Sequence, residues 1–241
     1  MSGERQLAPW LNSATVETVG QVLPKGRAEP ARRVRLSFED RRQQLLQACL
    51  LAFASRGLEL TTMDTIAAQA GVSKPLVYRH FPNRFEALLA VVDQQSEELL
   101  AVLDLEASPP LSDLILAYLT FASGSPAGFR LLFQMVDGSP GAARRRLQAV
   151  RAQLEDAVLS ATLRDAGADA ATANAARSAG LGPLLVSILE GVAGALREGD
   201  DPAPRARAVR QLLDPRWVLA SLLSGPELRP DARAVAPPLH A

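Results

Sequence analysis

Residues 62–84 have the sequence TMDTIAAQAGVSKPLVYRHFPNR, which predicts two short helices joined by a tight turn. Thr62 can cap the first helix, because its hydroxyl can accept a hydrogen bond from the free backbone N–H groups of the opening turn. Gly71 stands where that helix has to end in a left-handed conformation, which costs glycine almost nothing. Between them, apolar residues recur at helical spacing and predict one buried face: Met63, Ile66, Ala67 and Ala70.

The second helix of the pair is expected to begin after Ser73 and to end before Pro82. Ser73 should cap it, and Pro75 should lie in its first turn, where a missing N–H does no harm. Val77 and Phe81 are four residues apart and should face inward. The other faces then carry Lys74, Leu76, Tyr78, Arg79 and His80. This is the layout of a helix-turn-helix, whose second helix enters the major groove of DNA.

A longer helix is predicted before this pair. Residues 37–40 (SFED) are typical of a capping box, and their two acidic side chains favour the positive end of a helix. Gly57 should end this helix, after an apolar stripe at helical spacing that consists of Leu46, Cys49, Leu50 and Phe53. No base is recognisable near Cys49, so we interpret it as a small core residue and not as a nucleophile.

The rest of the chain predicts helices only. A helix over residues 84–106 is too long for a three-helix head alone and should connect the head to a second domain. Further helices are predicted over residues 111–122, 127–136, 142–166, 169–197 and 205–224. Gly182-Pro183 should kink or split the helix over residues 169–197, and Pro215 should do the same to the last one. No strand-like alternation or internal repeat is found, so the predicted fold class is all-α.

Both ends of the chain lack a sustained apolar period. Residues 1–36 contain scattered proline, glycine and serine and are interpreted as a disordered basic extension. This extension is either a solvated linker or an arm that adds phosphate or minor-groove contacts. The proline-rich residues 226–241 are interpreted as a flexible tail, and the run at 144–146 (RRR) as a solvated helix face.

The formal net charge of the 241 residues is zero, but the charge is unevenly distributed. Residues 1–36 contain six Arg and Lys against three Asp and Glu, and residues 37–84 contain six against four. Residues 85–241 contain fourteen against nineteen. The positive excess therefore lies at the end of the chain that carries the helix-turn-helix, as DNA phosphate binding requires.

The composition disfavours several other classes of protein. A single cysteine cannot form an internal disulfide and fits a reducing, cytoplasmic setting. No apolar run has the length of a membrane span, and no secretory signal is recognisable. Neither a metal site nor a cofactor is expected, since only two histidines are present. Enzymatic activity is disfavoured because no nucleophile–base pair, Glu-x-x-His spacing or glycine-rich phosphate loop is found.

The stretch AGVSKPLVYRHFPNRFEALLAVV, with the TT-M-D-x-IA start before it, resembles the DNA-binding domain of the tetracycline-repressor (TetR) family of transcriptional regulators. The resemblance covers roughly residues 37–92. It implies a three-helix DNA-binding domain over residues 37–83 and an effector-binding and dimerisation domain over residues 84–225. The family pairs its final two helices, here about 183–197 and 205–224, in a homodimer. The resemblance thus implies a repressor that binds a palindromic operator and is released by a small, largely apolar ligand.

The family's DNA contacts can be transferred to this chain one position at a time. Thr62 and Ser73 resemble phosphate contacts at helix N-termini, and Tyr78 and His80 resemble the side chains that bind the DNA backbone. Arg84 suits a further phosphate, and Arg79 suits a phosphate or a base. The base-facing start of the recognition helix corresponds to Lys74, Pro75 and Leu76. Met63 occupies a position that reaches a base in some members, but we interpret it first as a core residue.

The second domain has no comparable sequence motif that identifies its functional residues. An apolar effector pocket could be lined by Phe121, Phe129, Phe133, Met135, Leu185 and Trp217. Aromatic residues and methionine at helical spacing are also typical of an ordinary core, and that alternative stays open. Four other functions of the protein also stay open. It could be an activator, a regulator without a small-molecule effector, a helical enzyme, or an adaptor that uses its helices only for protein contacts.

Overall fold

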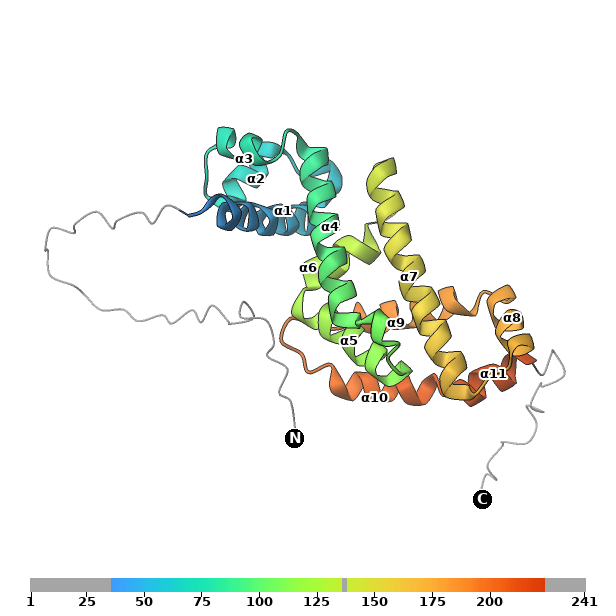
Figure 1. Cartoon of the computed structure of the whole chain (residues 1–241). Helices are drawn as coiled ribbons and strands as arrows, with labels where there is room; N and C mark the ends of the chain where they lie inside the picture. The colour runs from blue at the N-terminus through green and yellow to red at the C-terminus, as the bar shows by residue number, and fades with distance from the viewer. Residues whose placement is uncertain (1–35, 136–137, 224–241) are drawn as a thin grey trace, which may run out of the picture. The chain divides into compact units, whose positions relative to one another are not determined.

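A computed structural model describes residues 36–135 and 138–223 of the chain, without the side chains of residues 221–223 (Figure 1). In this part every regular element is a helix and no strand occurs, which confirms the all-α fold class. No helix within the described ranges combines the length and hydrophobicity needed to cross a membrane. The predicted extension and tail, residues 1–36 and 226–241, lie outside the described residues, apart from Leu36.

The first helix, α1 (Phe38–Leu60), begins with the capping box that the sequence predicts. Ser37 Oγ accepts a hydrogen bond from the backbone N–H of Asp40 at 3.0 Å, and the Asp40 carboxylate accepts one from the Ser37 N–H at 3.4 Å. Gly57 interrupts the helix with φ 80° and ψ 171°. This conformation is open to glycine and strained for other residues, so the regular part of α1 ends at Gly57, as predicted.

Two short helices follow α1, namely α2 (Met63–Ala70) and α3 (Lys74–His80). Thr62 Oγ1 accepts a hydrogen bond from the backbone N–H of Thr65 at 3.2 Å and so caps α2, as predicted. Gly71 ends α2 in the left-handed conformation with φ 65°. The helix-turn-helix predicted from the sequence is therefore present.

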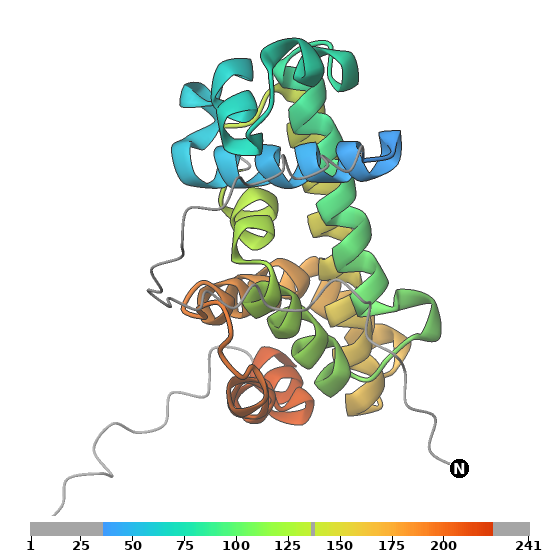
Figure 2. The same ribbon diagram turned by 90° about the vertical axis from the view of Figure 1, so that its left-hand side faces the viewer.

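The three helices of this head enclose a common core. α2 and α3 lie on the side of α1 opposite α5 and α6 (Figure 2). The core between them is formed by fully buried side chains, including Leu45, Cys49, Ile66, Val77 and Phe81. Burial raises the pKa of the Cys49 thiol to about 12, so the thiol stays protonated and behaves as a core residue.

A long helix, α4 (Arg84–Leu103), connects the head to the other helices. It packs against α1 at one end and against α5 and α7 further along. It ends earlier than the predicted range of 84–106, because Asp104 adopts a left-handed conformation with φ 47°. A single 3-10 turn, η1 (Leu105–Ala107), follows.

The body of the protein begins with α5 (Leu111–Gly124) and a short helix, α6 (Pro126–Phe129). α6 runs directly into η2 (Arg130–Gln134), a π-helical turn, so the single regular helix predicted over residues 127–136 is wrong. Turns of this kind occur at functional sites more often than ordinary helix does. The longest helix is α7 (Gly141–Ala166), close to its predicted range.

The alanine-rich stretch after α7 forms two helices, α8 (Ala170–Ser178) and α9 (Leu181–Ala193). The sequence predicts a break at Gly182-Pro183, whereas the break occurs earlier, at Gly180 with φ 70°. Pro183 then falls in the first turn of α9, where it costs no hydrogen bond. Gly182 instead permits a close approach to α7, since an added Cβ would lie 3.1 Å from the Glu155 carbonyl oxygen.

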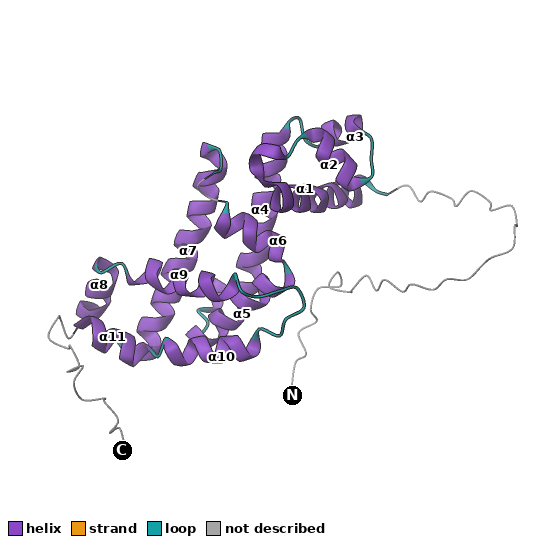
Figure 3. Cartoon of the chain, turned by 180° about the vertical axis from the view of Figure 1, so that it is seen from behind, coloured by secondary structure: helices purple, strands orange, loops and turns teal. Residues whose placement is uncertain are grey.

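The last two helices within the described residues are α10 (Ala203–Leu212) and α11 (Pro215–Leu223). Their separation confirms the predicted division at Pro215. α10 packs along α5, and α11 packs against α7 and α8 (Figure 3). The body is thus a bundle in which α5 contacts α4, α6, α7, α9 and α10, and α7 contacts α4, α5, α9 and α11.

Side-chain hydrogen bonds connect the head to the body. Arg130 Nη1, in η2, donates to the Ala54 carbonyl of α1 at 2.9 Å. Gln94 Nε2, in α4, donates to Gln43 Oε1 of α1 at 3.2 Å. α1 also packs directly on α6 and η2. A displacement of η2 would therefore shift α1, the helix against which α2 and α3 pack.

α4 and α6 approach each other closely at Gly128. Gln95 of α4 is 2% exposed, and its Oε1 accepts a hydrogen bond from Ser125 Oγ at 3.1 Å. Its Nε2 donates to the Glu98 carboxylate at 2.8 Å. A Cβ added at Gly128 would lie 1.9 Å from Gln95 Oε1 and 2.6 Å from Ser125 Oγ. Only glycine allows this buried amide to occupy its place.

We expect Gly128→Ala to lower the free energy of unfolding by about 1–3 kcal/mol, because the added methyl group would force Gln95 away from its partners. Urea denaturation at matched protein concentration measures the change. Gly141→Ala is the matched control, since a Cβ there meets only Arg145 Nη1 at an ordinary 3.7 Å. Equal stability of the two variants would show that the contact between α4 and α6 tolerates expansion.

Candidate nucleic-acid interface

The start of α3 presents the side chains that were predicted to face the bases. Lys74 and Pro75 are exposed, and Leu76 is partly exposed at the same end of the helix. Ser73 is the N-cap residue of α3, as predicted, but its hydroxyl makes no capping hydrogen bond. Because that hydroxyl is exposed and does not bind the helix end, its predicted role as a phosphate contact stays open.

Lys74 forms an ion pair that the sequence analysis did not predict. Its Nζ lies 2.8 Å from Oδ1 and 3.0 Å from Oδ2 of Asp64, the second residue of α2. Hydrogen bonding to Asp64 and its negative charge raise the pKa of the Lys74 ammonium. Lys74 therefore carries a full positive charge at neutral pH, and an acidic side chain lies within the predicted reading surface.

The later part of α3 presents two more of the predicted residues to solvent. The Tyr78 side chain is 44% exposed, and Arg79 is exposed beside it. Both lie on a helix whose buried side is formed by Val77, which has no exposed surface. The outer side of α3 therefore combines an aromatic hydroxyl with a guanidinium, as backbone binding requires.

His80 is less exposed than the other predicted contacts. Its ring stacks on Phe38 of α1, with 4.4 Å between the ring centroids. Burial lowers its pKa, and the positive charges of Arg42, Arg79 and Arg41 lower it further. These effects favour the neutral imidazole, which would meet a phosphate as a hydrogen-bond donor instead of as a cation. Its Nδ1 is buried and has no hydrogen-bond partner within the described residues.

Arg84 has a structural role that the sequence analysis missed. Its Nη1 donates to the carbonyl oxygens of Leu58, Glu59 and Thr61, at 3.2, 3.1 and 3.2 Å. These carbonyls follow the interruption of α1 at Gly57, where the regular helical hydrogen bonds end. Arg84 thus stabilises the connection between α1 and α2, and a phosphate contact would have to use its other N–H groups.

The two remaining predicted contacts differ in exposure. Thr62 is exposed at the start of α2, although its oxygen already accepts the capping hydrogen bond. Met63 is only 7% exposed and packs within the head, in agreement with its interpretation as a core residue. The exposed members of the predicted set therefore come from the start of α2, the start and outer side of α3, and the start of α4.

The residues predicted to line an effector pocket separate into two groups. Phe129 and Phe133 pack against Tyr118 with edge contacts at 6.1 and 5.4 Å between ring centroids. Phe121 and Leu185 are also buried in the body, and Met135 is partly buried. Trp217 does not join them, because its side chain is 67% exposed on α11.

Tyr118 is a candidate that the sequence analysis did not select. Its ring is fully buried at the centre of the aromatic group, and its hydroxyl has no hydrogen-bond partner within the described residues. Burial raises the pKa of this hydroxyl. Nearby, Arg151 of α7 pairs with Glu190 of α9, and burial raises the pKa of the Glu190 carboxyl. A polar group thus lies inside the apolar body.

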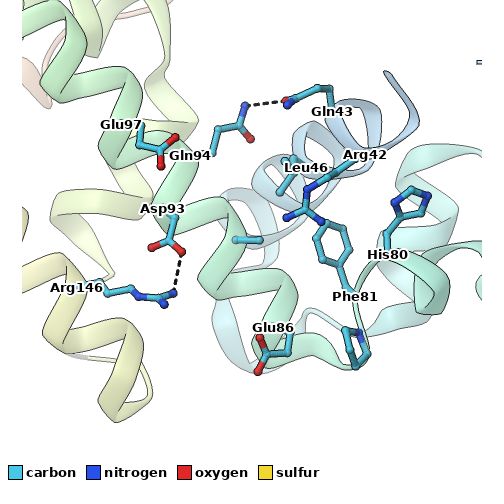
Figure 4. Close-up of a pocket in the computed structure, with 12 residues that line it drawn as sticks. Arg42, Gln43, Leu46, His80, Phe81, Glu86, Asp93, Gln94, Glu97 and Arg146 are labelled. Atoms are coloured by element: carbon cyan, nitrogen blue, oxygen red, sulfur yellow. Dashed lines mark hydrogen bonds and ion pairs between the residues drawn. The ribbon is translucent and has the colours of Figure 1, made fainter. Parts of the chain in front are cut away.

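Two hollows lie elsewhere on the described surface. One, between the head and α7, is mainly polar; Arg146 contacts Asp93 across it at 3.0 Å, and Arg42 lies 5.2 Å from the centre of the Phe81 ring (Figure 4). The other lies between the end of η1, α5 and α7 and includes Leu105, Leu114 and Ala157. Neither includes any residue of the predicted effector pocket, which therefore stays a prediction.

Comparison with known proteins supports the geometry of the head. Residues 45–91 match the sequence model of the family described as bacterial regulatory proteins, tetR family. The chain is 29% identical over 180 residues to the HTH-type transcriptional activator FasR of Mycolicibacterium smegmatis, covering 72% of this chain and 80% of that protein. It is 36% identical over 69 residues to the HTH-type transcriptional regulator SrpR of Pseudomonas putida, covering 29% of this chain and 32% of that protein.

The fold also matches solved structures. A TetR-like transcriptional regulator from Rhodococcus sp. RHA1 has a TM-score of 0.60 at 23% sequence identity. The match covers 79% of this chain and all of that chain. At this identity the likeness concerns the fold, which includes the body as well as the head.

We expect Arg84→Lys to lower the free energy of unfolding by about 1 kcal/mol, because lysine keeps the charge but its shorter side chain would not bring the ammonium to the three carbonyl oxygens that Arg84 Nη1 binds. Urea denaturation measures the loss. Arg79→Lys makes the same chemical change on the exposed side of α3 and should stay within about 0.5 kcal/mol of the wild type. If both variants lost the same stability, the structural role of Arg84 would be wrong.

Proposed function

Because the chain is a TetR-family transcriptional regulator that binds DNA and is not an enzyme, we propose that it acts as a homodimeric repressor on a palindromic operator. A small, largely apolar ligand would release it. The cytoplasm, where the chromosome lies in bacteria, is the proposed location.

The observation that carries the DNA-binding part of this proposal is the exposure of α3. Its inner residue Val77 is fully buried, whereas Lys74, Tyr78 and Arg79 are exposed. The helix lies on the side of α1 opposite α5 and α6 (Figure 2), and the exposure of these side chains shows that no element of the described chain covers its outer side. A cationic helix held in this way can enter a major groove, with Lys74 and Leu76 near base edges and Tyr78 near the backbone.

Exposed apolar side chains on the predicted pairing helices support a dimer. Leu184 and Ile188, four residues apart on α9, are 57% and 37% exposed. Gly191 continues the same face, where an added Cβ would meet nothing within 4 Å. Leu212 and Trp217, on α10 and α11, are 68% and 67% exposed. Large exposed apolar groups on the predicted pairing helices are typical of a surface that another molecule covers, and a second copy would bring two recognition helices to two half-sites.

The route by which a ligand would release DNA is supported by the position of η2. Phe133 lies in η2 and packs against Tyr118, while Arg130 of the same turn donates to the Ala54 carbonyl of α1. A ligand that entered the aromatic group would therefore shift a segment in direct contact with the head. It would change operator affinity only if it bound the two arrangements of that segment with different affinities.

Activation is a second candidate function, favoured by the name of one relative. FasR of Mycolicibacterium smegmatis, which resembles this chain over 180 residues, is named a transcriptional activator. The sign of regulation depends on where the operator lies relative to the promoter. In vitro transcription from the promoter beside this gene, with and without the protein, distinguishes the two, since a repressor lowers transcript yield and an activator raises it.

We expect Tyr78→Phe to weaken binding to the operator and to random DNA by the same factor, about three- to tenfold, because one hydrogen bond to the DNA backbone is lost. Gel-shift titration against the duplex fragment beside this gene measures it. Tyr118→Phe removes the same atom from the interior of the body and should leave DNA affinity unchanged. Unaltered binding by Tyr78→Phe would remove this hydroxyl from the interface.

We expect Leu184→Glu to convert the dimer to a monomer and to reduce operator affinity by about 10²-fold or more, since the two half-sites would no longer be bound together. Analytical ultracentrifugation and gel-shift titration measure the two effects. Leu116→Glu is the matched control, because this leucine is 41% exposed on α5, outside the predicted interface. A dimer that persists with Leu184→Glu would place the interface elsewhere.

A further inference from the structure

The pair between Asp64 and Lys74 joins the two helices of the helix-turn-helix on their exposed side. Asp64 is the second residue of α2 and Lys74 is the first residue of α3, and their carboxylate and ammonium lie 2.8 and 3.0 Å apart. The two side chains are 68% and 49% exposed. An acid in this position is unexpected, since DNA phosphates repel a carboxylate and attract only cations.

Two properties of the pair indicate that it does not serve mainly to hold the fold together. Exposed ion pairs change an equilibrium by only about two- to fivefold, because water and salt screen them. The capping interactions at Thr62 and the burial of Val77 already position α2 and α3. The pair is therefore weak enough to open when a better partner approaches the ammonium, and its main consequence concerns Lys74.

We propose that Asp64 is a specificity-determining residue, which restrains the Lys74 ammonium so that it does not bind phosphates indiscriminately. A lysine side chain is long and flexible, and on random DNA its ammonium can reach whichever phosphate is nearest. Asp64 competes for the ammonium at every such sequence. At a site that presents guanine O6 and N7 to the start of α3, the ammonium can donate a free N–H to these acceptors while it keeps its pair with Asp64, so only binding to random phosphates requires the pair to open.

This inference rests on the proposed binding of α3 to DNA, and it makes a separate statement about discrimination. Removing the carboxylate should strengthen binding to random DNA more than binding to the specific site. The ratio of the two affinities should therefore fall, although both affinities are retained. If Asp64 simply added affinity for DNA, removing its carboxylate would instead weaken binding.

The experiment uses the full-length protein and two duplexes of equal length, one selected by the wild-type protein from a library with a randomised core and one of random sequence. We expect Asp64→Asn to raise affinity for the random duplex about two- to fivefold and to steepen its salt dependence by about one released counterion. Affinity for the selected duplex should change by a smaller factor. Equal factors on both duplexes, or no change on either, would overturn the proposal.

A double-mutant cycle separates restraint of Lys74 from direct repulsion of phosphate. In the Lys74→Ala background, Asp64→Asn should no longer change the affinity for the random duplex, because no ammonium remains to be released. An undiminished increase in that background would mean that Asp64 acts on the phosphates directly, and the proposal would be wrong.

Glu106→Gln is the matched control for charge. It removes one negative charge from an exposed acid in η1, at the end of α4 away from the head (Figure 1). It should leave both affinities unchanged. An effect equal to that of Asp64→Asn would show that Asp64→Asn acts only through the net charge of the protein, and the proposal would be wrong. If the wild-type protein selected no duplex at all, the proposed operator binding itself would fail, which is distinguishable from each outcome above.

Discussion

The DNA-binding surface depends on the burial of two side chains, Val77 and Phe81. α3 has only seven residues, and a helix of this length is not stable by itself in water. Val77 is 0% and Phe81 is 1% exposed, so the inner side of α3 is attached to the core of the head. Because the inner side is held in this way, the direction of every other residue of α3 is determined. The recognition surface is therefore a consequence of core packing.

The same dependence on packing extends from the head into the body through α4. This helix contacts α1 at one end and α5 and α7 further along, and it buries the polar residue Gln95 against α6. Buried amides are tolerated only when their hydrogen bonds are made, and Gln95 makes two of them. Together with the bond from Arg130 to the Ala54 carbonyl, this arrangement gives the body two contacts by which a change in α6 and η2 can reach α1.

The exposed surface of α2 and α3 carries charges that attract DNA and one charge that opposes this attraction. Lys74 and Arg79 attract DNA of any sequence, whereas Asp64 opposes that attraction beside the first of them. The surroundings of His80 favour its neutral form, which adds no charge. A regulator has to distinguish one site among very many, and a modest cationic surface suits this task better than a uniformly positive one.

The sequence by itself determined the features that depend on neighbouring residues. The capping box at Ser37, the cap at Thr62, the left-handed Gly71 and the division at Pro215 were all predicted correctly, because each reflects backbone conformation and hydrogen bonding within a few residues. Helical periodicity likewise predicted the buried face of each helix in the head. Where local signals competed, the prediction was wrong, as with Gly180 and Gly182-Pro183.

Only the tertiary structure decided which distant side chains meet. Arg84 reaches carbonyl oxygens 23 to 26 residues away, Lys74 pairs with Asp64 ten residues away, and Gln95 occupies the space beside Gly128. Trp217 resembled a pocket residue in sequence but lies exposed on α11. Periodicity shows that a residue lies on one side of a helix, but the neighbouring helix decides whether that side is a core, an ion pair or open surface.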